Sequence, residues 1–119
     1  MNKKELSRLK RHRRIRLKMS GTGQRPRLVV KRSINNLFAS AIDDTQGKVI
    51  FSFSTASKEF KQTIKNAGNV KAAEVFGQLF SVKAKEKGIT KVIFDRAGFL
   101  YHGRVKAFAE SLRKNGMEF

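Results

Sequence analysis

Cysteine and tryptophan are absent from this sequence of 119 residues, and proline occurs once. Without cysteine, the chain has no disulfide bond, no thiolate nucleophile and no cysteine-based zinc site. Its two histidines, His12 and His102, are far apart in the sequence, so we expect no metal site. No apolar run approaches the roughly 20 residues that a membrane-spanning helix needs, so no membrane partner is expected either.

Acidic residues are also scarce. The chain has 9 Asp and Glu against 27 Lys and Arg, which gives a formal net charge of +18. Its length is that of one domain, since domains cluster at roughly 100 to 150 residues. Hydrophobic residues make up 39% of the chain and include ten Phe, which is enough to build a core. We therefore predict a single folded domain with a strongly basic surface.

The positive charge is concentrated near the beginning of the chain. Residues 1–32 hold 13 Lys or Arg and a single acid, Glu5, for a net charge of +12. Residues 4–19 contain no Gly or Pro, so a helix is permitted, but their apolar residues form no continuous stripe with a 3.6-residue period. Because like charges oppose compaction, we expect a solvated arm that becomes ordered on a polyanion. We place this arm and its flexible hinge at residues 1–24 and the globular domain at residues 25–119.

Basic segments of this kind have two other known uses. An organelle transit peptide is typically rich in serine, whereas this segment has only Ser7 and Ser20. A membrane-bound amphipathic helix needs bulky apolar anchors, and the segment contains no Phe, Tyr or Trp. Arginine, which donates paired hydrogen bonds to phosphate, is abundant here, and the rest of the chain is basic as well. The charge pattern therefore favours nucleic-acid binding.

Beyond the arm, the patterns predict strands followed by helices. Val49, Phe51 and Phe53 alternate with other residues and should share the buried face of a strand. Asn69 is a candidate N-cap and Gly88 a candidate end for the longest helix. The predicted strands are residues 27–33, 37–42, 49–54 and 91–94, the last of them fully buried, and the predicted helices are residues 57–65, 69–87 and 104–115. Since a helical crossover between two strands of one sheet makes them parallel, we predict an α/β fold: one mixed sheet, with an antiparallel three-strand meander and a fourth parallel strand, covered by helices.

The connection between the last strand and the last helix is unusually rich in chemically active side chains. Arg96 and Arg104 are suited to phosphate contacts, and Gly103 would let a phosphate approach the start of the helix. Tyr101 or His102 would stack on a base or form a hydrogen bond with a base or sugar. We interpret this loop as a nucleic-acid contact surface.

A structural interpretation of the same loop is compatible with the first. Asp95 would cap the turn or pair locally with Arg96, and Tyr101 would fill part of the core.

A magnesium-dependent nuclease is a second class of function to consider, with Asp43, Asp44, Glu74 and Asp95 as its acids. Their spacing favours separate structural roles, because the first two suit a hairpin turn and Glu74 suits the solvent side of a helix. We therefore predict no catalytic residue and no small-molecule substrate. A general DNA-compacting protein is a further alternative.

A set of short motifs follows the basic arm in a fixed order. They are Arg25-Pro26-Arg27-Leu28, Arg32-Ser33, Asp43-Asp44, Ala72-Ala73, Gly77, Ala84-Lys85-Glu86-Lys87-Gly88-Ile89, Phe94-Asp95-Arg96, Tyr101-His102-Gly103-Arg104-Val105, Gly116 and Phe119. Over nearly the whole chain, these motifs resemble the L-eighteen family of bacterial large-subunit ribosomal proteins.

The resemblance implies a protein of the cytoplasmic ribosome that binds 5S rRNA. It places the chain in the central protuberance, where it would join 5S rRNA to 23S rRNA beside neighbouring ribosomal proteins, without a cofactor or an enzymatic activity. Together with the charge pattern, it gives a set of expected RNA-contacting residues: Lys3, Lys4, Arg8, Lys10, Arg11, His12, Arg13, Arg14, Arg16, Lys18, Arg25, Arg27, Arg32, Ser33, Asn35, Asn36, Arg96, Tyr101, His102, Gly103 and Arg104.

Overall fold

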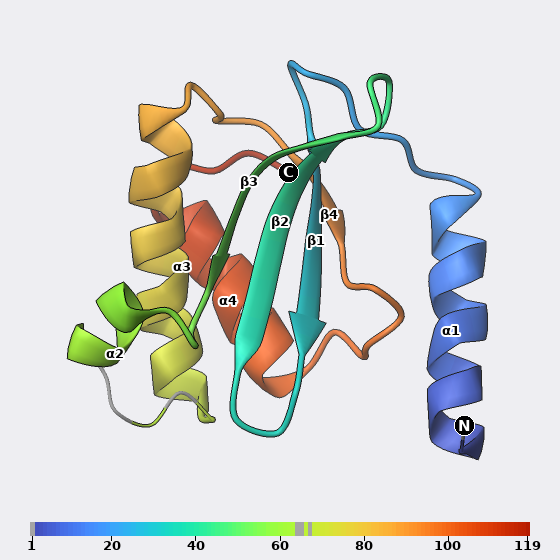
Figure 1. Ribbon diagram of the computed structural model, residues 1–119, viewed down its shortest axis with the longest axis horizontal. Coiled ribbons are helices and arrows are strands. Elements are labelled where there is room, and N and C mark those ends of the chain that lie inside the picture. Colours follow the sequence, from blue (N-terminus) through green and yellow to red (C-terminus); the bar gives the residue numbers. More distant parts are fainter. Residues whose placement is uncertain (1, 64–65, 67) are drawn as a thin grey trace.

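The sheet of the protein combines a three-strand antiparallel meander with a fourth strand that runs parallel to the first (Figure 1). The computed structural model describes residues 2–63, 66 and 68–119. The strands are β1 (Arg27–Arg32), β2 (Leu37–Asp43), β3 (Lys48–Ser54) and β4 (Ile93–Asp95), in the spatial order β3-β2-β1-β4. The helices are α1 (Lys3–Arg16), α2 (Lys58–Thr63), α3 (Val70–Glu86) and α4 (Gly103–Lys114). The predicted α/β fold with a mixed sheet is confirmed.

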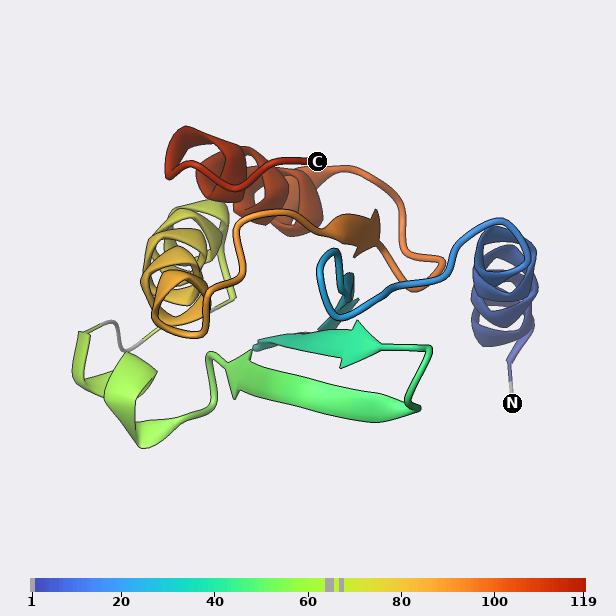
Figure 2. The same cartoon turned by 90° about the horizontal axis from the view of Figure 1, so that it is seen from above.

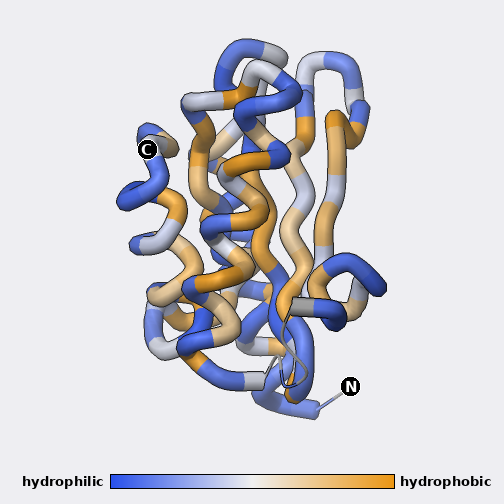
Figure 3. The backbone as a smooth tube through the Cα atoms, turned by 90° about the vertical axis from the view of Figure 1, so that its left-hand side faces the viewer, coloured by the Kyte–Doolittle hydropathy of each residue, from blue (hydrophilic) through white to orange (hydrophobic). Residues whose placement is uncertain are grey.

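Helices α3 and α4 pack against each other on one side of the sheet, and α1 stands apart from them at the other end of the molecule (Figure 2). Hydrophobic stretches follow the strands and recur along α3 (Figure 3). The ring of Phe76 on α3 stacks on Phe53 of β3, with 5.3 Å between ring centres, and on Phe108 of α4, with 5.0 Å. Phe60 of α2 meets Phe76 edge-on. One aromatic core therefore joins the sheet to three helices.

The ends of α3 agree with the sequence signals. Asn69 is the N-cap, and its side chain accepts a hydrogen bond of 2.8 Å from the backbone N–H of Ala72. Gly88 follows the last turn with φ of +76°, a left-handed conformation that favours glycine. The helix predicted at residues 57–65 is α2, whose predicted residues Ile64 and Lys65 lie outside the described residues. Within the described ranges, no helix combines the length and the apolar character needed to cross a bilayer.

The predicted alternation in β3 is wrong for its first part. Ala41 pairs with Phe51 but Ile42 pairs with Val49, so Ile50 is an extra residue that forms a β-bulge. Because side chains alternate between the two faces of a strand, one extra residue moves Val49 to the outer face, where it is 52% exposed. Ile50 packs against the core in its place.

The prediction for β4 is wrong in length and in burial. The strand pairs with β1 only from Ile93 to Asp95, at the edge of the sheet. Val92 is fully buried as predicted, but Ile93 and Phe94 are only half-buried. Lys91 instead forms an isolated parallel bridge with Glu118. An apolar run without alternation does not distinguish a central strand from an edge strand that the chain terminus covers.

Substitution of Gly77 by Val should separate α3 from α4. A Cβ atom on Gly77 would lie only 2.6 Å from the Cβ and Oγ atoms of Ser111, so the helices would have to move. We expect the free energy of unfolding in urea to fall by about 1–3 kcal/mol. Gln78→Val, at the next and exposed position of α3, is the matched control and should change it by less than about 0.5 kcal/mol. Equal stability of the two variants would contradict the close packing of the helices.

Candidate nucleic-acid interface

Helix α1 is attached to the rest of the protein by polar contacts with the loop after β4. Arg8 Nη1 donates a hydrogen bond of 2.8 Å to the Ala97 carbonyl, and Arg11 Nε donates one of 2.9 Å to the Gly98 carbonyl. No residue of α1 is fully buried. The sequence predicted a solvated arm that becomes ordered on a polyanion. The structure differs, because arginine side chains of α1 bind backbone carbonyls of the loop, and hydrophobic periodicity does not reveal such contacts.

Gly98 allows the backbone of α1 to come close to this loop. Its φ is +81°, and a Cβ atom there would overlap the carbonyl oxygen of Arg8 and lie 2.9 Å from the backbone nitrogen of His12. Only glycine fits both the left-handed backbone and the close approach. The loop is therefore shaped to receive the helix.

The two sides of α1 carry basic residues with different surroundings. Arg8, Arg11, His12 and Arg16 are half-buried on the side that faces the protein. The exposed basic residues of α1 and of the residues just after it are Lys3, Lys4, Lys10, Arg13, Arg14 and Lys18. The predicted arm residues thus divide into a set that attaches the helix and a set that is free to contact a polyanion.

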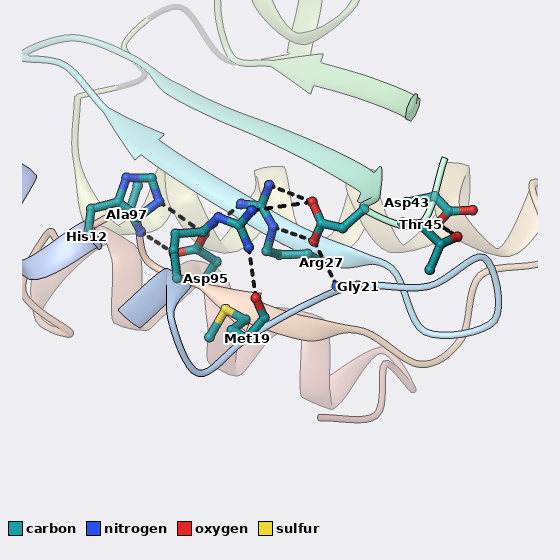
Figure 4. Close-up of polar contacts among 10 residues, drawn as sticks. His12, Met19, Gly21, Arg27, Asp43, Thr45, Asp95 and Ala97 are labelled. Carbon is teal, nitrogen blue, oxygen red and sulfur yellow. Dashed lines mark hydrogen bonds and ion pairs between the residues drawn. The ribbon is translucent and has the colours of Figure 1, made fainter. Parts of the chain in front are cut away.

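Asp95, which is fully buried at the end of β4, connects α1 to the sheet (Figure 4). Its Oδ2 accepts a hydrogen bond of 2.8 Å from Arg27 Nη1 and lies 3.1 Å from His12 Nε2. Its Oδ1 accepts one of 2.9 Å from the backbone N–H of Ala97. The expected local contact within the turn is present, but the cation that pairs with Asp95 is Arg27 and not Arg96. Arg96 instead donates to a carbonyl within its own loop.

Arg27 is also held by Asp44, which follows β2. Its Nε and Nη2 donate hydrogen bonds of 2.9 and 3.1 Å to the two carboxylate oxygens. The same carboxylate accepts a hydrogen bond of 2.7 Å from the backbone N–H of Gly21, in the segment predicted as a flexible hinge. Gly21 is buried, so the hinge is fixed at this point. Asp43 accepts hydrogen bonds from Thr45 within the hairpin turn, as the sequence predicted.

Two arginines from different elements contact the ring of Phe99. The guanidinium carbon of Arg8 is 4.6 Å from the ring centre and that of Arg32, at the end of β1, is 5.3 Å from it. A cavity of about 640 Å³ on one side of the ring is lined by Asn2, Lys3, Lys4, Glu5, Ser7, Arg8, Arg11, Arg32, Phe99 and Leu100. A second cavity of about 480 Å³ is lined by Arg32, Ser33, Ile34, Phe99 and Arg104. We call these two adjoining cavities, which share Arg32 and Phe99, the basic groove.

Glu5 is the only acid that lines the basic groove among the described residues, and it pairs with Arg8 at 2.6 Å. The groove therefore presents a surplus of positive charge to an approaching polyanion. It brings together the arm, the end of β1 and the start of α4, which are widely separated in the sequence.

The remaining predicted contact residues lie in several places. Ser33 and Asn35 are exposed in the turn between β1 and β2, and the Asn36 side chain accepts a hydrogen bond from Thr55. Arg25 is exposed and donates to the carbonyl of Val92 at 3.3 Å. Arg27 is 7% exposed and bound to two carboxylates, so it is not presented to a partner.

At the other end of the loop, Tyr101 and His102 are exposed beside the first residue of α4, Gly103, which has φ of +56°. The Tyr101 ring meets Phe94 edge-on at 6.4 Å, so its inner side packs on the protein while 42% of the residue is exposed. The structural interpretation therefore holds only in part for Tyr101, and its predicted contact with RNA stays a prediction.

The acids of the nuclease alternative lie in separate structural settings. Asp44 and Asp95 share Arg27, Asp43 closes a turn, and Glu74 is exposed on α3. Over residues 2–63, 66 and 68–119, no group of three or more His, Asp or Glu is placed to hold a metal ion.

Sequence reasoning missed the roles of two residues that shape the interface. Gly98 and Phe99 stand in a loop where a glycine and an aromatic residue are typical of a turn and of core packing. Their roles depend on α1, whose position the sequence did not predict.

A mixed α/β domain whose arm and loops form a cationic groove is typical of nucleic-acid-binding proteins. Comparison with known proteins makes this specific: residues 2–119 match the family described as ribosomal L18 of archaea, bacteria, mitochondria and chloroplasts. The chain belongs to this family. It is therefore a constituent of the large ribosomal subunit with ribosomal RNA as its partner, and the family is not one of enzymes.

Bacterial relatives cover almost the whole chain, and each is named large ribosomal subunit protein uL18. The relative from Desulforamulus reducens is 55% identical over 94% of this chain and 92% of its own length. The relative from Clostridioides difficile is 49% identical over 98% of this chain and 95% of its own length. The one from Aquifex pyrophilus is 52% identical over 94% and 92%. These matches confirm the family that the motifs resembled and agree with the predicted location on the bacterial cytoplasmic ribosome.

Replacing Asp95 by Ala should destabilise the fold strongly. The substitution leaves the buried Arg27 with one of its two carboxylate partners and removes the partner of His12. Asp44 still neutralises Arg27, but the buried donors of Arg27 and Ala97 lose their acceptor. We therefore expect the free energy of unfolding to fall by about 2–5 kcal/mol in urea titrations. Glu118→Ala, which removes an exposed acid 4.0 Å from Lys91, should cost less than about 1 kcal/mol. Similar losses in both variants would show that the Asp95 network contributes little.

The pair formed by Asp44 and Arg27 should make stability depend on pH in acid. The Arg27 guanidinium, chiefly through hydrogen bonding, holds the pKa of the Asp44 carboxyl below its ordinary value. A lowered folded-state pKa stabilises the protein above the ordinary pKa, near 4, and this contribution disappears as the pH falls through the lowered value. Below about pH 4, the free energy of unfolding should therefore decrease more steeply in the wild type than in Asp44→Asn. Parallel pH curves for the two proteins would refute this linkage.

Proposed function

We propose that the protein binds 5S rRNA through its basic groove and the exposed side of α1, and attaches 5S rRNA to 23S rRNA in the central protuberance beside neighbouring ribosomal proteins. The family supports a role in the large subunit. The basic groove is the observation that supports this RNA-binding surface. In it, α1, β1 and the loop before α4 place cations around Phe99.

The two parts of the chain contribute differently to this binding. Residues 1–24 form the RNA-binding arm, whose six exposed basic residues supply attraction to phosphates without dependence on sequence. Residues 25–119 form the globular domain, whose Arg32, Ser33 and Arg104 occupy fixed positions and supply recognition of RNA shape. Arg27 and Asp95 are buried, and they hold the interface in position without contacting the RNA themselves.

A duplex-compacting protein needs only cationic attraction. This chain surrounds an aromatic ring with arginines and presents neutral Ser33 and Asn35 beside them, a mixture suited to a folded RNA with exposed bases and 2′-hydroxyl groups. Binding should therefore favour folded 5S rRNA over duplex DNA of equal charge at equal salt.

Removing residues 1–20 should weaken binding to 5S rRNA and reduce its salt dependence. Each lost phosphate contact lowers the slope of log affinity against log salt by about 0.7–0.9, so loss of several contacts is measurable by filter binding between 50 and 200 mM salt. The matched variant Lys10→Gln/Arg13→Gln/Arg14→Gln changes only the exposed side of α1 and should lower the slope by about 2–3.

Stability separates the two variants. The deletion removes His12 and the arginines that bind the loop, so its melting temperature should fall, while the triple glutamine variant should melt like the wild type. An unchanged salt slope in both, or equal binding of duplex DNA and 5S rRNA by the wild type, would contradict the proposed function.

A further inference from the structure

Two arginines converge on the smaller cavity of the basic groove from separate elements. Arg32 ends β1 and Arg104 lies in the first turn of α4, and both line the cavity of about 480 Å³ with Phe99 and Ser33. Among the described residues, neither guanidinium has a carboxylate within 4.0 Å. Two neighbouring positive charges without a counter-charge repel each other, and this repulsion is relieved when an anion lies between them.

Each arginine is held in place by its own contact. The Arg104 Nη2 donates a hydrogen bond of 2.6 Å to the Ser33 carbonyl, and Arg32 lies over the face of Phe99 at 5.3 Å. Within the part of the chain that the structure describes, these contacts leave donors on both guanidiniums without an acceptor. Because the side chains are already ordered, a ligand that bridges them has little conformational entropy to overcome.

The second terminal nitrogen of Arg104 lacks an acceptor. Nη1 is buried and has no hydrogen-bond partner among the described residues. Buried donors are nearly always paired, so an unpaired one needs an explanation. A phosphate oxygen in the cavity that Arg104 lines would supply an acceptor once the guanidinium turned toward it.

The electrostatics of Arg104 agree with this geometry. Burial, and in second place the nearby charge of Arg32, lower the pKa of Arg104 from its ordinary value, although arginine stays charged at neutral pH. The positive end of α4, beside Arg104, favours a negative charge at the same place.

We propose that Arg32 and Arg104 together form a seat for one phosphate group of the RNA backbone, bridged between their guanidiniums and bordered by Phe99. This inference rests on the proposed function, because the phosphate belongs to the bound rRNA. It goes further by assigning the two arginines to one phosphate rather than to two separate contacts.

The salt dependence of 5S rRNA binding distinguishes a shared phosphate from separate ones. We expect Arg32→Gln and Arg104→Gln each to lower affinity on the order of tenfold, as loss of a hydrogen bond to a charged group does. The double variant should lower the slope of log affinity against log salt by about 1, since one phosphate is lost. A decrease of about 2, which two separate phosphates would give, or no decrease, overturns the proposal.

A matched double variant controls for net charge. Arg113→Gln/Lys114→Gln removes two exposed cations at the far end of α4 and should leave the slope unchanged. If it lowers the slope as much as the groove variant does, the effect belongs to overall charge and the seat is refuted. Thermal melting of all variants verifies that each is folded.

A second measurement on the full chain separates this proposal from the proposed function. Inorganic phosphate, titrated at low ionic strength, should shift the Nε–Hε resonances of Arg32 and Arg104 together along one saturable curve, while chloride at equal ionic strength and the Arg113 resonance show no such change. If neither groove resonance responds to phosphate, the seat is wrong even if 5S rRNA binds. If both respond but 5S rRNA does not bind, the seat stands as an anion site and the proposed function fails.

Discussion

Burial of the Arg27 guanidinium is the constraint on which the rest of the interface depends. A charged group that is 7% exposed is costly unless carboxylates neutralise it and accept its hydrogen bonds. Asp44 and Asp95 do both, and each also connects Arg27 to another part of the chain. Asp44 binds the backbone of Gly21, and Asp95, at the end of β4, binds His12 of α1. One cation in β1 thereby fixes the positions of the hairpin turn, the arm and the loop before α4.

This use of carboxylates also shapes the charge of the surface. The chain has nine acids for 27 cations, and two of the nine are consumed inside the Arg27 network. Glu5, on the surface, is paired with Arg8. The acids therefore neutralise positions that organise the fold, and the basic groove between α1 and the start of α4 is left with its positive charge. Among the described residues, Glu5 is the one acid that lines the groove, so the groove keeps a surplus of positive charge.

The sequence predicted the elements that apolar burial controls and missed those that polar contacts control. Helices α3 and α4 have apolar residues at helical spacing and recognisable caps, so they were predicted to within one residue at each end. The β-bulge at Ile50 changes which residues at the start of β3 face the core, and the residue types of the strand do not reveal it. Strand β4 lies at the sheet edge but has an apolar run like that of a central strand. The candidate residues of the arm and of the loop were predicted chiefly from charge and from the family motifs. That they lie together around Phe99 depends on Arg8 and Arg11, which bind the carbonyls of Ala97 and Gly98, and no sequence pattern predicts such contacts.

Because polar contacts rather than apolar burial hold α1, the docking of α1 and the binding of RNA influence each other. Helix α1 has no buried residue, so its attachment depends on a few polar contacts, each worth about 1 kcal/mol net. Repulsion among its exposed cations acts against those contacts. A polyanion on the exposed side of α1 cancels the repulsion without touching the contacts with Ala97, Gly98 and Asp95, so it stabilises the docked helix. By linkage, the docked helix strengthens binding of the polyanion to the same degree, because Arg8 and Arg11 are then already in place along the groove.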